Sequence, residues 1–502
     1  MSGRVVLVGA GPGDPGLLTL RGREWLAAAD VVVCDYLVHG RLLEAVRPEA
    51  EVIRVGSSHG DPHRLSQQAI EALLIARARE GKLVVRLKNG DPFLFGRGGE
   101  EATALRAAAV PFEVVSGVTS ALAVPAWAGI PVTHRAHASL VTIATGHQAA
   151  TPDVPSAPPQ LPWELLARLG GTLVFLMGIR HLEAILERLL AGGLDPAMPA
   201  AVVERGTLGT QRTVVATAAT LAEQARTAAV RAPAVLVIGR VVELREQVAW
   251  VTDRPLLGRR IVVTRPRDQA PELARLLEAC GAEVLVAPTI VLDPPVDPAP
   301  LERAVAAADA YDWIVFTSAN GVRAFFARYD APALPVFTVG QATAQVAHAS
   351  GFRTVVSADG TGEDLADLLA RRLHPDDGAI LHPAAETVSF SLAAALEPLG
   401  FEVREIAVYR ALVATELPPT AVRALSEHSA DGILFFSVRT AAQFVTLAQK
   451  AKLQPALVSV TAFALSDQIA RALRIVRWRT VRIAERPDLG GLLDAVDQSQ
   501  GL

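Results

Sequence analysis

Short runs of apolar residues alternate with mixed, helix-like segments along the whole chain of 502 residues. The run at 5–8 is Val-Val-Leu-Val, and the run at 31–34 is Val-Val-Val-Cys. Both are continuously apolar and rich in β-branched residues, which is typical of strands buried in a sheet. Buried strands that alternate with helices predict an α/β protein, and the chain length predicts three or four domains.

Two segments interrupt this alternation and indicate domain boundaries. The segment 148–162 holds five prolines and is typical of a surface loop or linker. The segment 250–260 is a second linker candidate, because the apolar run Ile-Val-Val follows it. We expect a first domain at 1–250 with α/β subdomains at about 1–147 and 160–250, a linker at 251–257, and a second domain at 258–502.

The second half of the chain repeats one unit. The stretch 312–326, DWIVFTSANGVRAFF, resembles the stretch 431–444, DGILFFSVRTAAQF. Each has an acid, an apolar strand, a serine at the strand end and then a helix. Two copies predict two lobes, about 258–292 plus 412–502 and 296–408, with a cleft between them. Ser318 and Ser437 are expected to face this cleft, because open α/β sheets bind ligands at their strand ends.

Composition narrows the classes of function. Apolar residues make up 51% of the chain and the net charge is −4, so large cores form and no nucleic-acid partner is implied. Cys34 and Cys280 are the only cysteines, which excludes a disulfide framework or a cysteine zinc site. No signal peptide is visible, and no apolar run reaches the ~20 residues that span a membrane. We therefore expect a cytoplasmic protein without a membrane partner.

The turn at 9–16, GAGPGDPG, satisfies the G-x-G-x-x-G pattern of dinucleotide-binding proteins, and an acid, Asp35, follows about 20 residues later. That pattern needs a helix that begins within the glycines and directs its N-terminus at a pyrophosphate. Here two prolines flank Asp14, which places an acid where the phosphate would lie. Because two negative groups would repel, we interpret the turn as one that holds a ligand without phosphate.

Four further stretches accompany this turn: RLKNGDPFLFGRGGEE (86–101), VVSGVTSALAVPAWAGIPVTHR (114–135), TLVFLMG (172–178) and AAVVERGT (200–207). Together with the first turn they resemble the uroporphyrinogen-III C-methyltransferases, the S-adenosylmethionine-dependent enzymes that make precorrin-2. The resemblance is nearly continuous from Val5 to about Trp250. It implies the tetrapyrrole-methyltransferase fold, which has two α/β subdomains.

The resemblance also implies where S-adenosylmethionine binds. Glycine amides can bind its carboxylate, an aspartate can accept from its amino group or ribose, and a methionine can line the adenine. For Gly90 and Gly206 taken singly, a role in tight turns alone is an equal alternative. The residues at matching positions are Pro12, Asn89, Gly90, Asp91, Leu94, Thr119, Ser120, Met177 and Gly206.

Asp35 matches the proposed proton acceptor of the family, and a helix cap is its structural alternative. Arg97 and Arg135 are predicted to bind carboxylates of the substrate. Ser57 and Ser58 depart from the family, because lysine and arginine are usual there and the lysine is taken as a proton donor. This departure leaves open an altered or weakly active methyltransferase.

The second half resembles uroporphyrinogen-III synthase through VVTRP, FTSANGV, VGQATA, TGEDLADLL, VYRA and FFSVRTAAQF. The resemblance implies closure of hydroxymethylbilane with inversion of ring D, without metal or cofactor. Tyr409 matches a tyrosine proposed to assist loss of the hydroxyl, and an ordinary strand tyrosine is the equal alternative. The predicted substrate-binding residues are Arg265, Ser318, Asn320, Thr343 and Ser437.

These resemblances together predict a bifunctional enzyme of the sirohaem or cobalamin branch. It would make uroporphyrinogen III and methylate it at C2 and C7 to precorrin-2, with S-adenosylhomocysteine as the second product. We also expect a homodimer through the methyltransferase half. Two alternatives stay open at this point: an active synthase joined to an altered methyltransferase, and a non-enzymatic module that senses the cofactor or a tetrapyrrole.

Overall fold

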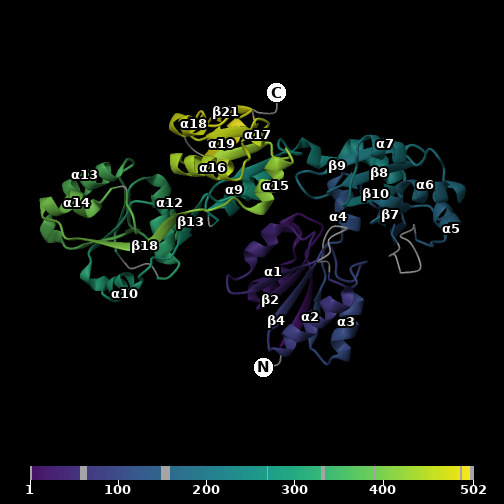
Figure 1. Cartoon of the computed structure of the whole chain (residues 1–502), viewed down its shortest axis with the longest axis horizontal. Coiled ribbons are helices and arrows are strands. Elements are labelled where there is room, and N and C mark those ends of the chain that lie inside the picture. Colours follow the sequence, from purple (N-terminus) through teal and green to yellow (C-terminus); the bar gives the residue numbers. More distant parts are fainter. Residues whose placement is uncertain are drawn as a thin grey trace. The chain divides into compact units, whose positions relative to one another are not determined.

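The computed structural model describes residues 3–56, 65–147, 159–267, 269–329, 334–388, 390–486 and 489–497. Within these residues the strands form four sheets, two in each half of the chain (Figure 1). Helices alternate with the strands, so the predicted α/β class is confirmed. The chain divides into two compact units, made mainly of residues 3–261 and 285–496. No helix in the described segments is long and apolar enough to cross a membrane.

The first sheet has five parallel strands in the order β3-β2-β4-β1-β5. They are β1 (Arg4–Gly9), β2 (Val31–Asp35), β3 (Glu51–Val55), β4 (Leu83–Lys88) and β5 (Phe112–Val115). The helical segments of this subdomain are η1 (Pro15–Leu17), α1 (Leu20–Ala28), η2 (Gly40–Ala45), α2 (Gln67–Arg79) and α3 (Gly98–Ala107).

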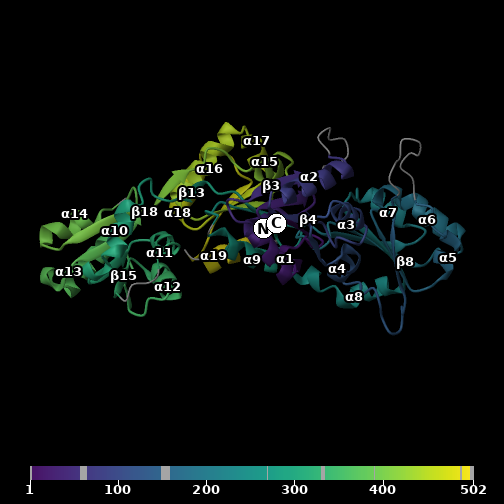
Figure 2. The ribbon, with the colours of Figure 1, turned by 90° about the horizontal axis from the view of Figure 1, so that it is seen from below.

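Alternate residues of β1 enter two different cores, which explains why the strand is apolar throughout. Val6 packs with Leu26 of α1 on one face of the sheet. Leu7 packs with Leu74 of α2 and Leu105 of α3 on the other face. Figure 2 shows α2 and α3 side by side on this second face. Because helices cover both faces, polar groups that need access gather at the strand ends.

The second sheet has the order β6-β7-β10-β8-β9, and β10 runs antiparallel to both of its neighbours. Its strands are β6 (Val141–Thr145), β7 (Thr172–Leu176), β8 (Pro199–Glu204), β9 (Arg212–Thr217) and β10 (Ala234–Ile238). The helical segments are α4 (Ser120–Trp127), α5 (Trp163–Arg168), η3 (Ile179–His181), α6 (Leu182–Ala191), α7 (Leu221–Thr227), η4 (Arg240–Leu244), α8 (Arg245–Val248) and η5 (Trp250–Asp253).

Small residues let α4 pack closely on the second sheet. Its Ala121 and Val124 join a core with Val174 of β7 and Val203 of β8. A separate core between α6 and the same sheet contains Leu186. The amino end of α4 follows β5 of the first sheet, so this helix links the two subdomains. Of the predicted linker at 148–162, residues 148–158 lie outside the described residues.

The third sheet has the order β12-β11-β19-β20-β21, and β19, β20 and β21 are parallel. Its strands are β11 (Arg260–Val263), β12 (Glu283–Val286), β19 (Gly432–Phe435), β20 (Thr461–Ala464) and β21 (Thr480–Ile483). The helices are α9 (Ala270–Ala279), α15 (Pro419–Ser426), α16 (Val438–Lys450), α17 (Gln454–Leu457), α18 (Asp467–Leu473) and α19 (Leu489–Asp497).

The fourth sheet has the order β13-β18-β17-β14-β15-β16 and is parallel except for β13. Its strands are β13 (Ile290–Asp293), β14 (Trp313–Phe316), β15 (Val336–Thr338), β16 (Val355–Ser357), β17 (Ile380–Ala385) and β18 (Val403–Val413). The helical segments are α10 (Ala299–Ala306), η6 (Ala308–Ala310), α11 (Ala319–Phe326), α12 (Gln341–Ala349), α13 (Gly362–Arg372), η7 (Pro375–Asp377), α14 (Leu392–Leu396) and η8 (Glu397–Leu399).

The repeated sequence unit forms the same local structure in both of these sheets. β14 leads through Ser318 into α11, and β19 leads through Ser437 into α16. The expected lobe edge at 292 differs from the observed pairing. β13 pairs with the far end of β18, which places Ile290–Asp293 in the fourth sheet rather than the third.

Candidate active sites

Three glycine turns meet at the carboxyl end of the first sheet. Gly11 and Gly90 exchange backbone hydrogen bonds at 3.2 and 2.8 Å, which ties the turn after β1 to the turn after β4. A Cβ atom on Gly117 would lie only 2.2 Å from the carbonyl oxygen of Gly90. The contact therefore requires glycine at position 117, because any side chain would separate the turns.

The first turn differs from a dinucleotide turn in the way the sequence predicts. Its helix, α1, begins at Leu20, beyond the glycines, and a short 3-10 segment at Pro15–Leu17 precedes it. The Asp14 carboxylate caps that segment by accepting from Gly16 N at 2.7 Å. Pro12 lies in the same turn. No α-helix begins within the glycines of this turn.

Open space lies in front of Gly90, which has a φ of +67°. A Cβ atom there would approach only Ser120 N, at 4.0 Å, at the amino end of α4. Thr119 caps this helix by accepting from Ala121 N at 3.2 Å. Leu94 is partly buried against the core that α4 forms with the second sheet. The glycine backbone and the helix amide form a polar cradle around this open space.

Asp91 has a structural role that the motif did not reveal. Its Oδ1 accepts from Phe93 N at 2.8 Å, and its Oδ2 accepts from Gly117 N at 3.0 Å. Oδ1 therefore stabilises the turn after β4, and Oδ2 ties that turn to the turn after β5. The predicted contact of this carboxylate with the cofactor would have to use its remaining lone pairs.

Two turns of the second sheet contain backbone in the left-handed region. Met177 follows β7 with a φ of +59° and is 49% exposed. Gly206 follows β8, and a Cβ atom on it would lie 2.3 Å from Val124 Cγ1. Thr207, which sequence reasoning missed, has a φ of +72°, an unfavourable conformation for a β-branched residue.

Thr207 connects the two subdomains. Its hydroxyl accepts from Asp14 N at 3.1 Å, and its own amide donates to Gln211 Oε1 at 2.9 Å. The first glycine turn is thereby tied to the turn after β8. Strained backbone persists where surrounding contacts hold it, and such residues cluster at binding sites. The sequence contains no local signal for this conformation, because threonine rarely adopts it.

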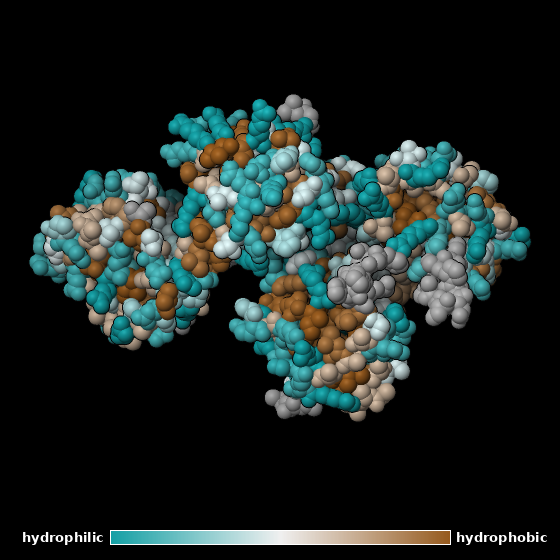
Figure 3. Space-filling model, viewed as in Figure 1, coloured by the Kyte–Doolittle hydropathy of each residue, from teal (hydrophilic) through white to brown (hydrophobic). Residues whose placement is uncertain are grey.

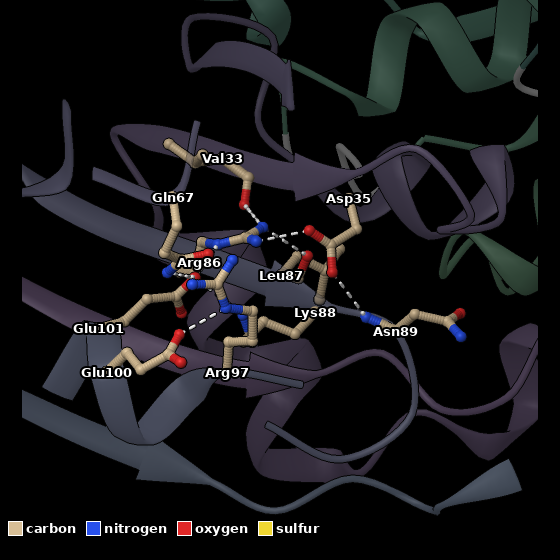
Figure 4. A network of polar contacts seen from close by, with 10 residues as sticks. All are labelled: Val33, Asp35, Gln67, Arg86, Leu87, Lys88, Asn89, Arg97, Glu100 and Glu101. Carbon is tan, nitrogen blue, oxygen red and sulfur yellow. Dashed lines mark hydrogen bonds and ion pairs between the residues drawn. The ribbon is translucent and has the colours of Figure 1, made fainter. Parts of the chain in front are cut away.

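Asp35 lies at the end of β2, where the chain turns away toward β3, while the neighbouring β4 leads toward β5 on the opposite side. Diverging connections of this kind mark the usual ligand site of an α/β sheet. Asp35 Oδ1 lies 2.5 Å from Arg86 Nη2, and its Oδ2 accepts from Asn89 N at 3.3 Å (Figure 4). The side chain is 29% exposed and caps no helix.

Arg86 belongs to a buried network of charges that sequence reasoning also missed. Its Nε donates to Glu101 Oε1 at 3.1 Å, and Lys88 Nζ donates to the same oxygen at 2.8 Å. Burial would lower the pKa of Arg86, but the Asp35 and Glu101 carboxylates outweigh it and raise the pKa. One signal was available: Arg86 and Lys88 stand two residues apart in an apolar strand, so they share a face.

The predicted substrate arginines are exposed. Arg97 directly precedes α3 with a φ of +59° and makes no capping hydrogen bond with its side chain, and its Nε lies 2.5 Å from Glu100 Oε2. Arg135 is exposed in the turn after α4 and belongs to neither the glycine cradle nor the Asp35 network. Ser57 and Ser58 lie outside the described residues.

In the second half, Ser318 and Tyr409 come together although 91 residues separate them. Their hydroxyls are 3.2 Å apart, and the Ser318 hydroxyl also accepts from Gly321 N to cap α11. Tyr409 is only 9% exposed and packs in the core of the fourth sheet. Its hydroxyl therefore has a fixed position at the end of β14.

The other predicted synthase residues differ in their surroundings. The Arg265 guanidinium lies 4.1 Å from the centre of the Phe436 ring. Burial and then the charge of Arg323 lower the pKa of Arg265. Asn320 Oδ1 accepts from Gln269 Nε2 at 2.5 Å.

Ser437 and Thr343 have mainly structural surroundings. The Ser437 hydroxyl accepts from Thr440 N at 3.1 Å and so caps α16. Thr343 is only 5% exposed in the first turn of α12. It therefore lies beyond the strand end at which the sequence predicted it.

A histidine that no motif indicated lies fully buried next to this site. His382 Nε2 is 3.0 Å from Thr317 Oγ1, and its Nδ1 is 3.4 Å from Glu405 Oε2. The contact with His382, together with the amide of Ala393, lowers the pKa of Glu405 against the opposing effect of burial. Polar side chains thereby connect the end of β14 with the interior of β17 and the first residues of β18.

Comparison with known proteins assigns the two halves to two families. Residues 4–222 match the family of tetrapyrrole (corrin/porphyrin) methylases, and residues 271–494 match uroporphyrinogen-III synthase HemD. The porphyrin biosynthesis protein HemD of Ruminiclostridium josui is 34% identical over 501 residues, which cover 98% of this chain and 97% of that protein.

Two further relatives match the first half. An S-adenosyl-L-methionine-dependent uroporphyrinogen III methyltransferase of Methanosarcina barkeri is 49% identical over 244 residues, covering 49% of this chain and 94% of that protein. The uroporphyrin-III C-methyl transferase from Thermus thermophilus, whose crystal structure was solved with S-adenyl homocysteine, is 41% identical in sequence to the matched part of this chain. The match covers 48% of this chain and 100% of that chain, with a TM-score of 0.41. With both family matches and a relative aligned along nearly its whole length, the chain belongs to the bifunctional tetrapyrrole-biosynthesis family that joins a uroporphyrinogen-III C-methyltransferase to a uroporphyrinogen-III synthase.

Proposed function

We propose that this chain converts hydroxymethylbilane to uroporphyrinogen III with inversion of ring D and then methylates the product at C2 and C7 to precorrin-2. The observation that carries the proposal is the presence of both families in one chain, with a relative that aligns across both. The product of the synthase half is the substrate of the methyltransferase half. The two matched regions, 4–222 and 271–494, support a division into two domains, which we propose at 1–250 and 258–502 with a linker at 251–257.

The first half is proposed to use S-adenosylmethionine, which supplies a methyl group activated by its sulfonium. Gly90 and the amide of Ser120 would bind its carboxylate end, because their backbone forms the open cradle described above. Pro12, Asn89, Asp91, Leu94, Thr119, Met177 and Gly206 are proposed to surround the rest. Asp35 would accept the proton that the methylated tetrapyrrole loses, while Arg97 and Arg135 would bind substrate carboxylates.

In the second half, the proposed step breaks the bond between carbon and the terminal hydroxyl of the bilane. The hydroxyl takes a proton and leaves as water, and positive charge develops along the bilane. Tyr409 is proposed to donate a hydrogen bond to this hydroxyl, with Ser318 fixing the phenol 3.2 Å away. Arg265, Asn320, Thr343 and Ser437 are proposed to contact the substrate, in which case the buried Thr343 must become exposed.

We further propose a homodimer formed through the methyltransferase half, a cytoplasmic location, a product that serves sirohaem or cobalamin synthesis, and no metal requirement.

The apolar surface of the first subdomain supports the dimer. Figure 3 shows apolar residues over the part of the first subdomain that Figure 1 labels β2 and β4. Tyr36, Leu37, Phe93 and Phe95 are among the exposed large apolar side chains of this subdomain. Contiguous patches of this kind often mark interfaces.

A coupled assay tests the proposed function. Purified full-length protein receives hydroxymethylbilane and S-adenosylmethionine, and absorbance follows precorrin-2 and its oxidation product. We expect precorrin-2 to form. If unmethylated uroporphyrinogen III accumulates, the synthase half is active and the methyltransferase is altered, and Ser57→Lys with Ser58→Arg is then the next variant. If ligands bind without any turnover, the chain is a sensing module instead.

A further inference from the structure

Glu101 is the centre of the charge network beside Asp35 (Figure 4). Its Oε1 accepts from Arg86 at 3.1 Å and from Lys88 at 2.8 Å, and the side chain is 0% exposed. Its Oε2 has no hydrogen-bond partner among the residues that the structure describes. A carboxylate that is buried away from water is stable only when cations pair with it. Glu101 and its two cations therefore act as one unit.

Arg86 links Glu101 to Asp35, so the position of the Asp35 carboxylate depends on Glu101. Its Nε bonds to Glu101, its Nη2 bonds to Asp35, and its Nη1 donates to the carbonyl of Val33 at 3.3 Å. The three groups lie on three sides of one planar guanidinium that is only 3% exposed. Because the fork of arginine is rigid, moving any of these partners moves the others.

Lys88 completes the balance of charge. Two carboxylates and two cations sum to zero, so the network places no net charge beside the strand ends. Burial and the nearby charge of Arg86 lower the pKa of Lys88, while Glu101 opposes this shift. In the sequence, the strands β3 and β4 and the helix α2 lie between Asp35 and Glu101, and only the folded sheet joins these two residues through Arg86.

We propose that Glu101 is a positioning residue for methyl transfer: through Arg86 it holds the Asp35 carboxylate where the tetrapyrrole loses its proton. The proposal rests on the proposed role of Asp35. Because Glu101 is 0% exposed, it would act on Asp35 through Arg86, which bonds to both carboxylates, rather than by contact with a ligand. Fixing a reacting group to within a fraction of an ångström is worth about 100-fold in rate.

A double-mutant cycle in the full-length protein tests this proposal. Asp35→Asn, Glu101→Gln and the double variant are compared in single turnover with uroporphyrinogen III and S-adenosylmethionine. We expect Glu101→Gln to lower the rate of methyl transfer about 100-fold and to leave the KM for S-adenosylmethionine unchanged. In the Asp35→Asn background the same change should cause no further loss, because the residues act in series. If the rate losses of the two single variants multiply in the double variant, the proposal is overturned, because independent losses indicate a general structural role of Glu101.

A second measurement does not depend on activity. A crystal structure of Glu101→Gln should show the Asp35 carboxylate displaced from Arg86, and an unchanged contact overturns the proposal. If Glu101→Gln does not fold, Glu101→Asp replaces it in both experiments. This variant keeps the charge, but its shorter side chain cannot hold Arg86 in the same position. Glu80→Gln is the matched control, because Glu80 is exposed and pairs with Arg77 away from the site.

The outcomes separate this proposal from the proposed function. Full activity of Asp35→Asn removes the role of Asp35 and, with it, the basis for Glu101. Loss of activity in Asp35→Asn with a wild-type rate in Glu101→Gln overturns the positioning role alone. If both single variants lose activity and the double variant is no slower than Asp35→Asn, both proposals are supported.

Discussion

The two halves place polar side chains at their strand ends by different means. At the first sheet, Asp35 is held by a buried arginine that a second carboxylate fixes. At the fourth sheet, Ser318 and Tyr409 share one uncharged hydrogen bond. Buried ion pairs hold their side chains rigidly, but the loss of one partner costs much folding stability. Neutral hydroxyls are held by weaker hydrogen bonds, which rearrange more easily.

This difference matches the chemistry proposed for each half. Methyl transfer requires one carbon and one proton acceptor to be aligned within a small tolerance. Closure of a flexible bilane is shared among many contacts along a long substrate, so no single polar group has to be fixed as firmly. The comparison predicts that point changes in the first site are severe and that those in the second are mild.

The largest expected effect comes from removing the central cation. Arg86→Met leaves Glu101 with Lys88 alone and leaves Asp35 without its ion pair. Breaking one partner of a buried network costs about 3–5 kcal/mol, so the first half should unfold at clearly lower urea concentration. Hydrogen exchange measured by mass spectrometry on β4 and β1 peptides would show this loss. Unchanged protection would mean that the network contributes no rigidity.

Steric change in the glycine turns should have the next largest effect. Gly117→Ala places a methyl group 2.2 Å from Gly90 O, so the turns must separate. Forcing such overpacking costs about 1–3 kcal/mol, and binding of S-adenosylhomocysteine measured by calorimetry should weaken. The matched variant Gly90→Ala meets open space and pays only for its positive φ, about 1 kcal/mol. Equal stability losses in the two variants would contradict the packing argument.

The serines at the two repeated strand ends give a smaller and more selective effect. Each caps a helix, so Ser318→Ala and Ser437→Ala should each cost about 1 kcal/mol. Ser318 also contacts Tyr409, so Ser318→Ala should lower the rate of uroporphyrinogen III formation more than Ser437→Ala does. Equal rates for the two variants would leave Ser318 with capping as its sole function.

The smallest effect concerns acid stability of the fourth sheet. Contacts with His382 and Ala393 lower the folded pKa of Glu405, so this carboxylate binds protons less readily in the folded state. Its stabilising contribution is complete above the unfolded pKa of about 4.3 and is lost as pH falls through the lower folded value. Glu405→Gln should therefore flatten the decline of stability below about pH 5, as measured by thermal unfolding across pH. An unaltered decline would show that Glu405 does not contribute.

Local sequence signals predicted more of the first site than of the second. The glycines at 117 and 206 stand where backbones or side chains approach too closely for another residue, whereas Gly90 has a positive φ of +67°. No other residue fits at such close contacts, so the glycine in the motif itself predicts the local backbone structure. Hydroxyl residues such as Thr343 and Ser437 have several alternative functions, and one of them is buried while the other caps a helix. Their presence in a motif therefore predicted position but not surroundings.

The sequence by itself determined the α/β class, the order of the two families along the chain and the turns that meet at the first sheet. These features depend on strand and helix periodicity and on backbone conformations that single residues dictate. Only the tertiary structure decided that Arg86 joins Asp35 to Glu101, 51 residues away on one side and 15 on the other, and that Ser318 meets Tyr409. Such pairings depend on sheet order and burial, because a charge or hydroxyl acquires its role from whichever partner the fold places beside it in a site with little water.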